Sequence, residues 1–161
     1  MKRFAVVLSL LVVSGGLPAA AGSPDADFLQ AALKAEVGQY DLGLIGQRKG
    51  AAGTVKGFAA QLASEASSAV AALKKLAAAQ HVAFQEDAEL RTKAQYQDLE
   101  GRTGTDFDRT LAHDAMIDTN IALDAFADEA QHGSDPALRR FAQEQLPKLR
   151  ADLKMSQALG G

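Results

Sequence analysis

The clearest hydrophobic pattern in the sequence lies in residues 54–79. Apolar side chains recur there in alternating steps of four and three residues, at Val55, Ala59, Leu62, Ala66, Ala69, Leu73 and Leu76. This spacing keeps one stripe of an α-helix facing a partner. Most of the residues between them are polar or charged. We therefore expect an amphipathic helix that is stable only when other helices cover its stripe.

Three further segments carry helical stripes of this kind, at residues 27–49, 105–132 and 136–160. Thr105 is expected to cap the third helix, with Asp108 completing a capping box, and Gly133 is expected to end that helix. Its stripe consists of Ala112, Ala115, Thr119, Ala122 and Phe126. The stripe of the last helix consists of Leu138, Phe141, Ala142, Gln145, Leu146, Leu149, Asp152, Leu153 and Ser156. Polar groups are thus expected inside the bundle.

The first helix has two candidate stripes. One is Leu29, Leu33, Val37, Tyr40 and Leu44, and the other is Phe28, Ala32, Ala35, Gln39, Leu42 and Gly46. A glycine in a helix interior costs about 1 kcal/mol relative to alanine. We therefore expect Gly38, Gly43 and Gly46 to let a neighbouring helix approach closely. A phosphate-binding loop is the rival interpretation, but no strand precedes these glycines and no Lys-Ser/Thr follows them.

The connections between the helices indicate the topology. Residues 50–53 are few enough to force the first two helices antiparallel. Residues 80–104 carry few apolar side chains, with a short helix predicted near residues 89–99, and they are numerous enough to recross a bundle. The sequence therefore predicts an all-α, up-down bundle of four helices with a crossover between the second and third.

The N-terminal residues have the features of a secretory signal peptide. Lys2 and Arg3 precede an apolar run over residues 4–13, and small residues at 19–21 form a cleavage pattern. A membrane-spanning anchor needs about 20 apolar residues, roughly twice this run. We expect residues 1–21 to be removed and residues 22–161 to form the bundle domain, with a periplasmic or secreted location and no membrane span after cleavage.

Composition excludes several function classes. The chain has 161 residues, of which 47% are hydrophobic, so one domain with a substantial core is expected. The 17 basic residues against 20 acidic ones argue against nucleic acid as a partner. No cysteine is present, which excludes disulfides, thiolate metal ligands and a cysteine nucleophile.

Several short motifs, in their order and spacing, resemble the DUF4142 family. These motifs are Phe28-Leu29-Gln30, Leu42-Gly43, Val55-Lys56-Gly57-Phe58-Ala59, Phe107-Asp108, Asp135-Pro136-Ala137-Leu138-Arg139-Arg140-Phe141-Ala142 and Leu146-Pro147-Lys148-Leu149-Arg150. The resemblance covers residues 27–159. It implies an exported bacterial four-helix protein with a ferritin-like arrangement, of the kind often labelled an outer membrane protein. The activity of the family is unknown.

The family pattern usually carries a glutamate in the first helix and a histidine in each of the other three. The corresponding positions here are Gln39, Ala66, Thr119 and Asp152. The stripes place the last three inward and Gln39 on one of its two candidate stripes, so we expect all four to point inward. A ferritin-like metal centre needs inward carboxylates and imidazoles. If relatives bind metal at this layer, we expect this chain to have lost the site.

Other polar residues give only weak indications of a site. Glu129 and His132 form a Glu-x-x-His pair, but at a helix end beside Gly133, where a solvated pair is the simpler interpretation. Asp114 and Asp118 stand one turn apart, which would suit a cation or a paired acid and base, although such residues usually lie on a helix shoulder. No nucleophile, base and oxyanion set can be assembled.

The sequence therefore favours a non-enzymatic protein without a cofactor. We expect an exported helical bundle with a binding or structural role toward an unidentified periplasmic or envelope protein. The alternative is a metal-binding or oxidase-like ferritin relative with a degenerate site that uses Asp152, Thr119 and nearby acids. Asp118, Glu129 and His132 are the other candidate metal ligands.

Overall fold

The computed structural model describes residues 23–83 and 90–160, and these residues form five helices and no strand. The helices are α1 (Pro24–Lys49), α2 (Gly53–Ala79), α3 (Leu90–Gly101), α4 (Gly104–His132) and α5 (Pro136–Gly160). The all-α prediction is confirmed. The predicted signal peptide lies outside the described residues. Within these residues, no helix is both long and apolar enough to cross a membrane.

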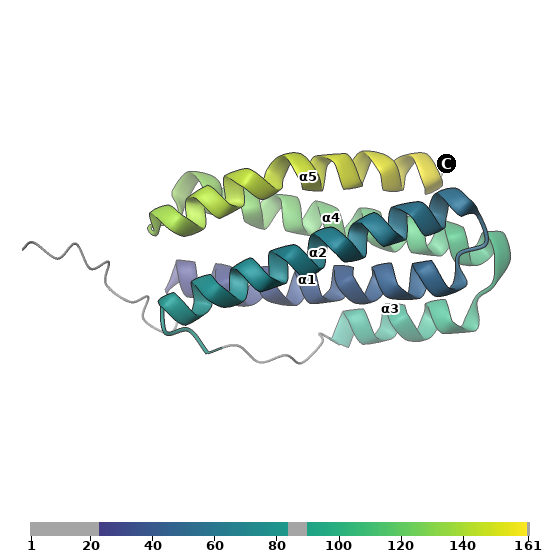
Figure 1. Cartoon of the computed structure of the whole chain (residues 1–161), viewed down its shortest axis with the longest axis horizontal. Helices are drawn as coiled ribbons and strands as arrows, with labels where there is room; N and C mark the ends of the chain where they lie inside the picture. The colour runs from purple at the N-terminus through teal and green to yellow at the C-terminus, as the bar shows by residue number, and fades with distance from the viewer. Residues whose placement is uncertain (1–22, 84–89, 161) are drawn as a thin grey trace, which may run out of the picture.

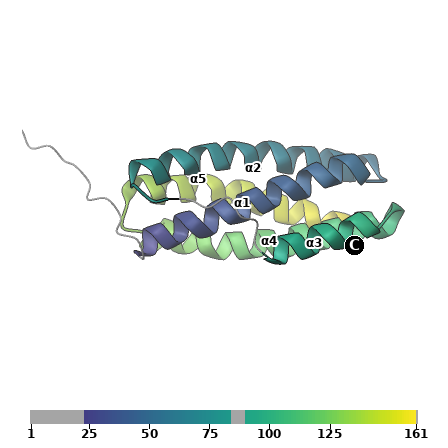
Figure 2. The same ribbon diagram turned by 90° about the horizontal axis from the view of Figure 1, so that it is seen from below.

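The four long helices form two antiparallel hairpins, α1 with α2 and α4 with α5 (Figure 1). The hairpins meet chiefly through α1 and α4, while α2 and α5 contact each other less closely. α2 ends near the start of α1, whereas α4 begins at the opposite end of the bundle (Figure 2). The short helix α3 lies between these two points and packs beside α1 and α4. The connection from α2 to α4 thus recrosses the bundle, as predicted.

Glycines on α1 let α2 approach closely. A Cβ atom added to Gly43 would lie 2.7 Å from the Cβ of Ala63, and one added to Gly46 would lie 2.6 Å from the Cβ of Ala59. Real side chains do not approach so closely, so alanine does not fit at either glycine without a shift of the helices. The predicted role is confirmed for Gly43 and Gly46, whereas a Cβ atom added to Gly38 would meet only the side chain of Thr92 on α3, at 3.2 Å.

The buried side chains largely follow the predicted stripes, and the clearest differences are on α1 and α2. On α1 the stripe that contains Gln39 is buried apart from the half-buried Ala35, whereas the other stripe is buried only at its start and is exposed at Tyr40 and Leu44. On α2 the stripe is buried up to Leu73, and Ala77 rather than Leu76 completes it. α1 also begins earlier than expected, because Ser23 caps it by accepting a hydrogen bond from the Ala26 N–H at 3.2 Å.

The capping box predicted at the start of α4 is wrong. Thr103 occupies the N-cap position without a side-chain cap bond, and Thr105 lies inside the helix. The carboxylate of Asp108 instead accepts hydrogen bonds from the backbone N–H groups of Ala51 and Ala52, both at 2.8 Å. Two strong hydrogen bonds to a distant part of the chain thus replace the capping box that was predicted within α4.

The apolar core consists of two clusters, one toward each end of the bundle. The first contains Phe28, Leu33, Leu73, Phe126 and Leu138, among others, and the second contains Ile45, Phe58, Leu62, Phe107 and Leu111, among others. Along every long helix, the residues that separate the two clusters include a buried polar side chain or a small one. The bundle therefore has a polar layer across its middle.

Candidate functional site

The polar layer contains the four positions that the sequence analysis placed inward. Gln39 on α1, Ala66 on α2, Thr119 on α4 and Asp152 on α5 are 3%, 2%, 0% and 3% exposed. The inward orientation predicted for all four is confirmed. Gln39 donates a hydrogen bond from Nε2 to Thr119 Oγ1 at 3.3 Å, which joins the two hairpins across the core.

Two further acids belong to this layer, and the sequence analysis missed both. Glu36, one turn before Gln39, is buried, and Glu65, beside Ala66, is half-buried. Together with Asp152 they bring three carboxyl groups from α1, α2 and α5 to one cavity of about 20 Å³. Gln39, Gln145 and Lys148 also line this cavity. Its spacing could have predicted the burial of Glu36, because it lies on one helical stripe with Ala32 and Gln39.

Burial and mutual repulsion favour the protonated form of these acids. Burial, then the charge of Asp152, raises the pKa of Glu36 to about 8; Glu65 raises it further and Lys148 opposes the shift. Burial, followed by repulsion from Glu65, raises the pKa of Asp152 to about 7. At neutral pH the layer therefore holds protons that an exposed set of carboxyl groups would release.

The hydrogen bonds of the layer are incomplete. Gln61 donates from Nε2 to Glu65 Oε1 at 3.0 Å and to Asp152 Oδ1 at 3.5 Å. Gln39 Oε1 and Glu65 Oε2 are buried without a protein partner. A buried polar atom without a partner costs about 1–3 kcal/mol, and the cavity has room for roughly one water molecule. The layer is thus suited to a single bridging water and offers no space for an organic substrate.

The layer also lacks the geometry of a metal centre. Among residues 23–83 and 90–160, no group of three or more His, Asp and Glu side chains is arranged to hold a metal ion. None of the side chains that line the cavity is an imidazole.

In the Glu129 and His132 pair, the imidazole pairs with a different carboxylate. His132 Nδ1 lies 2.8 Å from Asp128 Oδ1 on the exposed side of α4. Glu129 is buried, contrary to the solvated pair that the sequence suggested, and its Oε1 atom has no hydrogen-bond partner. Burial, then the charges of Asp25, Asp135 and Asp128, raises the pKa of Glu129 to about 7.

Asp114 and Asp118 lie on the shoulder of α4, as the simpler interpretation predicts. Burial and the neighbouring charge of Asp118 raise the pKa of Asp114 to about 6. Gln95 on α3 donates a hydrogen bond from Nε2 to Asp118 Oδ1 at 3.2 Å. Asp118 thus helps to attach α3 to α4, which is a structural role.

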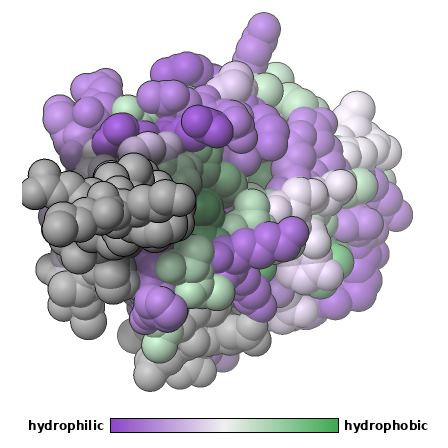
Figure 3. Space-filling view, turned by 60° about the vertical axis from the view of Figure 1, so that its left-hand side comes forward, coloured by the Kyte–Doolittle hydropathy of each residue, from purple (hydrophilic) through white to green (hydrophobic). Residues whose placement is uncertain are grey.

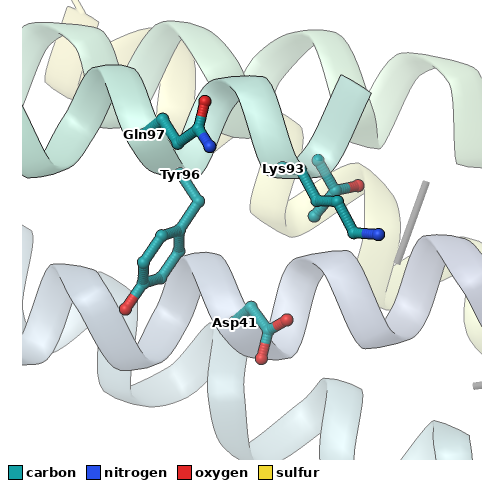
Figure 4. A pocket seen from close by; sticks show the side chains of 5 residues that line it. Asp41, Lys93, Tyr96 and Gln97 are labelled. Atoms are coloured by element: carbon teal, nitrogen blue, oxygen red, sulfur yellow. The ribbon is translucent and has the colours of Figure 1, made fainter. Parts of the chain in front are cut away.

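The outer face of α1 lies between two larger hollows, and Asp41 lines both. The hollow toward α3, of about 340 Å³, is lined by Asp41, Thr92, Lys93, Tyr96 and Gln97 (Figure 4). The hollow toward α2, of about 410 Å³, is lined by Val37, Tyr40, Asp41, Ser67, Val70 and Lys74. Partial burial raises the pKa of Asp41. These hollows are wide enough for side chains of a partner.

Comparison with known proteins identifies a family and no activity. No curated protein and no solved structure matches the chain. The family model described as a domain of unknown function, DUF4142, matches residues 14–159, which is nearly the whole chain. The chain therefore belongs to the DUF4142 family.

Proposed function

We propose that this protein is an exported, non-enzymatic binding module that contacts a partner protein through the outer face of α1. The observation that carries the proposal is the contrast in size between its cavities. The acids of the core surround about 20 Å³, whereas the hollows beside α1 reach about 340 and 410 Å³. The space for a ligand thus lies on the outer face of α1, whereas the carboxyl groups of the core are enclosed.

The face between the hollows has the composition of a protein contact. Tyr40 and Leu44 are 37% and 43% exposed on successive turns of α1. Tyrosine is enriched among the residues that dominate binding energies, and an apolar centre with a polar rim is typical of an interface. Asp41 and Lys74 provide polar contacts at its edge. A partner segment with an apolar side chain would fit this face.

The signal-peptide pattern supports export, and the proposed partner is therefore a protein of the periplasm or envelope. A crossover between two helical hairpins is compatible with a ferritin-like arrangement, which we include in the proposal. A metal-binding ferritin relative is the alternative, and the meeting of Glu36, Glu65 and Asp152 at one cavity is the observation in its favour. The metal content of protein purified without chelator and without a nickel column distinguishes the two.

Site-specific photocrosslinking in the native host tests the binding face. A photoreactive phenylalanine analogue at Tyr40 should give one defined adduct in the exported protein, and Leu44→Asp should remove that adduct. The same analogue at Gln157, exposed on α5, is the matched control. The proposal is wrong if position 40 gives no adduct or gives the same adducts as position 157.

A further inference from the structure

A third hollow lies at the end of the bundle where α1 begins and α4 ends. It encloses about 380 Å³ and is lined by Pro24, Asp27, Phe28, Ala31, Ala125, Asp128, Glu129, His132 and Gly133. Figure 3 views this end of the molecule and shows patches of apolar surface among polar side chains. The lining thus combines carboxyl groups with apolar side chains.

Glu129 is the acid in this hollow with a buried carboxyl oxygen that has no hydrogen-bond partner. Its side chain is 4% exposed, packs against Gly133, and leaves Oε1 without a hydrogen-bond partner. A buried carboxyl oxygen without a donor is costly, so it indicates a missing partner that carries N–H or O–H groups.

The charges around Glu129 are mostly of its own sign. Asp25, Asp128 and Asp135 all raise its pKa, and only Arg139 opposes them. The Arg139 guanidinium donates instead to the carbonyl oxygens of Gly133 at 2.7 Å and Ser134 at 3.1 Å. His132 pairs with Asp128, and Asp25 binds the turn between α4 and α5. No nearby cation within the described residues is therefore directed at the Glu129 carboxylate.

We propose that this hollow binds a primary ammonium group, with Glu129 and Asp27 as its acceptors. An ammonium group donates up to three hydrogen bonds and tolerates acceptors that do not converge tightly. A metal ion would need three or more converging ligands, and the described residues contain no such group. Phe28, Ala31 and Ala125 would cover an alkyl stem attached to the ammonium group.

The ammonium group has two possible sources. One is the α-amino group of the chain itself, since the export that we propose would create a new N-terminus at or near Gly22, one residue before the cap of α1. The other is an alkylammonium ligand or lysine side chain from outside. The second source does not depend on export.

NMR titration of the Glu129 carboxyl carbon tests the proposal, with n-butylammonium as the probe and full-length protein at constant ionic strength. Binding should lower the Glu129 pKa in a saturable way and should weaken by about tenfold in Asp27→Asn, the loss expected for one charged contact. Asp124→Asn, on the exposed side of α4, is the matched control and should bind as the wild type does. n-Butanol should cause no shift.

The exported, processed protein is compared with the same protein after N-terminal acetylation. A Glu129 pKa that is lower in the free-amine form identifies the α-ammonium as the occupant, whereas a response to n-butylammonium alone identifies an external amine. If neither is seen, or if Asp124→Asn weakens binding as much as Asp27→Asn, the ammonium site is wrong. Failure of export would appear separately, as an intact Met1 in the mass spectrum.

Discussion

Asp25 and Asp108 join the two hairpins from opposite ends of the bundle. Asp25, in the first turn of α1, accepts hydrogen bonds from the backbone N–H groups of Ser134 at 2.9 Å and Asp135 at 3.0 Å. Asp108, in the second turn of α4, does the same for Ala51 and Ala52. Each hairpin therefore receives, at its own turn, a carboxylate from the first helix of the other hairpin.

These reciprocal contacts predict a loss of stability when either carboxylate becomes an amide. Asp25→Asn and Asp108→Asn should each lower the free energy of unfolding by about 1–3 kcal/mol, because an amide has one acceptor oxygen for two backbone donors. Asp124→Asn, which is exposed, should change it by less than about 0.5 kcal/mol. Urea unfolding measures all three, and equal values would show that the turn contacts contribute nothing.

The close approach of α1 and α2 predicts opposite effects for two glycine substitutions. Gly43→Ala should destabilise by about 1–3 kcal/mol, because the added Cβ would lie 2.7 Å from the backbone N of Ala63. Gly57→Ala meets no atom within 4 Å and should stabilise α2 by about 0.5–1 kcal/mol. Thermal and urea melts give both values; stabilisation by both alanines would contradict the packing described.

The register of α2 predicts that adjacent residues differ strongly. Leu73 is fully buried and Lys74 is exposed. Leu73→Ala should cost about 2–5 kcal/mol through lost burial and a residual cavity, whereas Lys74→Ala should cost less than about 0.5 kcal/mol. Similar losses in urea melts would mean that the register is wrong.

Thr119 and Asp152 show which part of the site the sequence could predict. Both lie on regular stripes, so helical spacing alone places them inside, and the structure confirms this. Glu36 and Glu65 were missed because a charged residue beside an apolar stripe usually faces water. Their burial also depends on residues of α5 that line the same cavity, and the position of α5 is a tertiary property.

Asp108 shows why local patterns can be misleading. Its position three residues after Thr105 fits a capping box, and nothing nearby in the sequence competes with that interpretation. Its actual partners, Ala51 and Ala52, lie 57 and 56 residues away in the chain. Only the packing of the two hairpins brings them together, so periodicity could predict the helices and not this contact.

The acids of the central layer predict a stability that falls as pH rises. The pKa of Asp152 is raised from 3.8 to about 7 and that of Glu36 from 4.5 to about 8, so the folded state holds protons that the unfolded chain releases. This contribution is fully present below about pH 4 and is lost as pH rises through the folded pKa values, toward about pH 8. Asp152→Asn and Glu36→Gln should flatten this dependence.

Denaturant midpoints at pH 4.5 and pH 8 measure this effect. Both variants should equal or exceed the wild type in stability at pH 8, because each lacks one of the two carboxyl groups that would be charged in the core. Near pH 4.5 both should differ little from the wild type. Glu144→Gln, exposed on α5, is the matched control and should keep the wild-type dependence. A bound cation would reverse the sign, since it would favour the carboxylates and make Asp152→Asn destabilising at pH 8. Chelator would then destabilise the wild type and Glu144→Gln but not Asp152→Asn, and that outcome would mean that the layer binds a metal ion rather than protons.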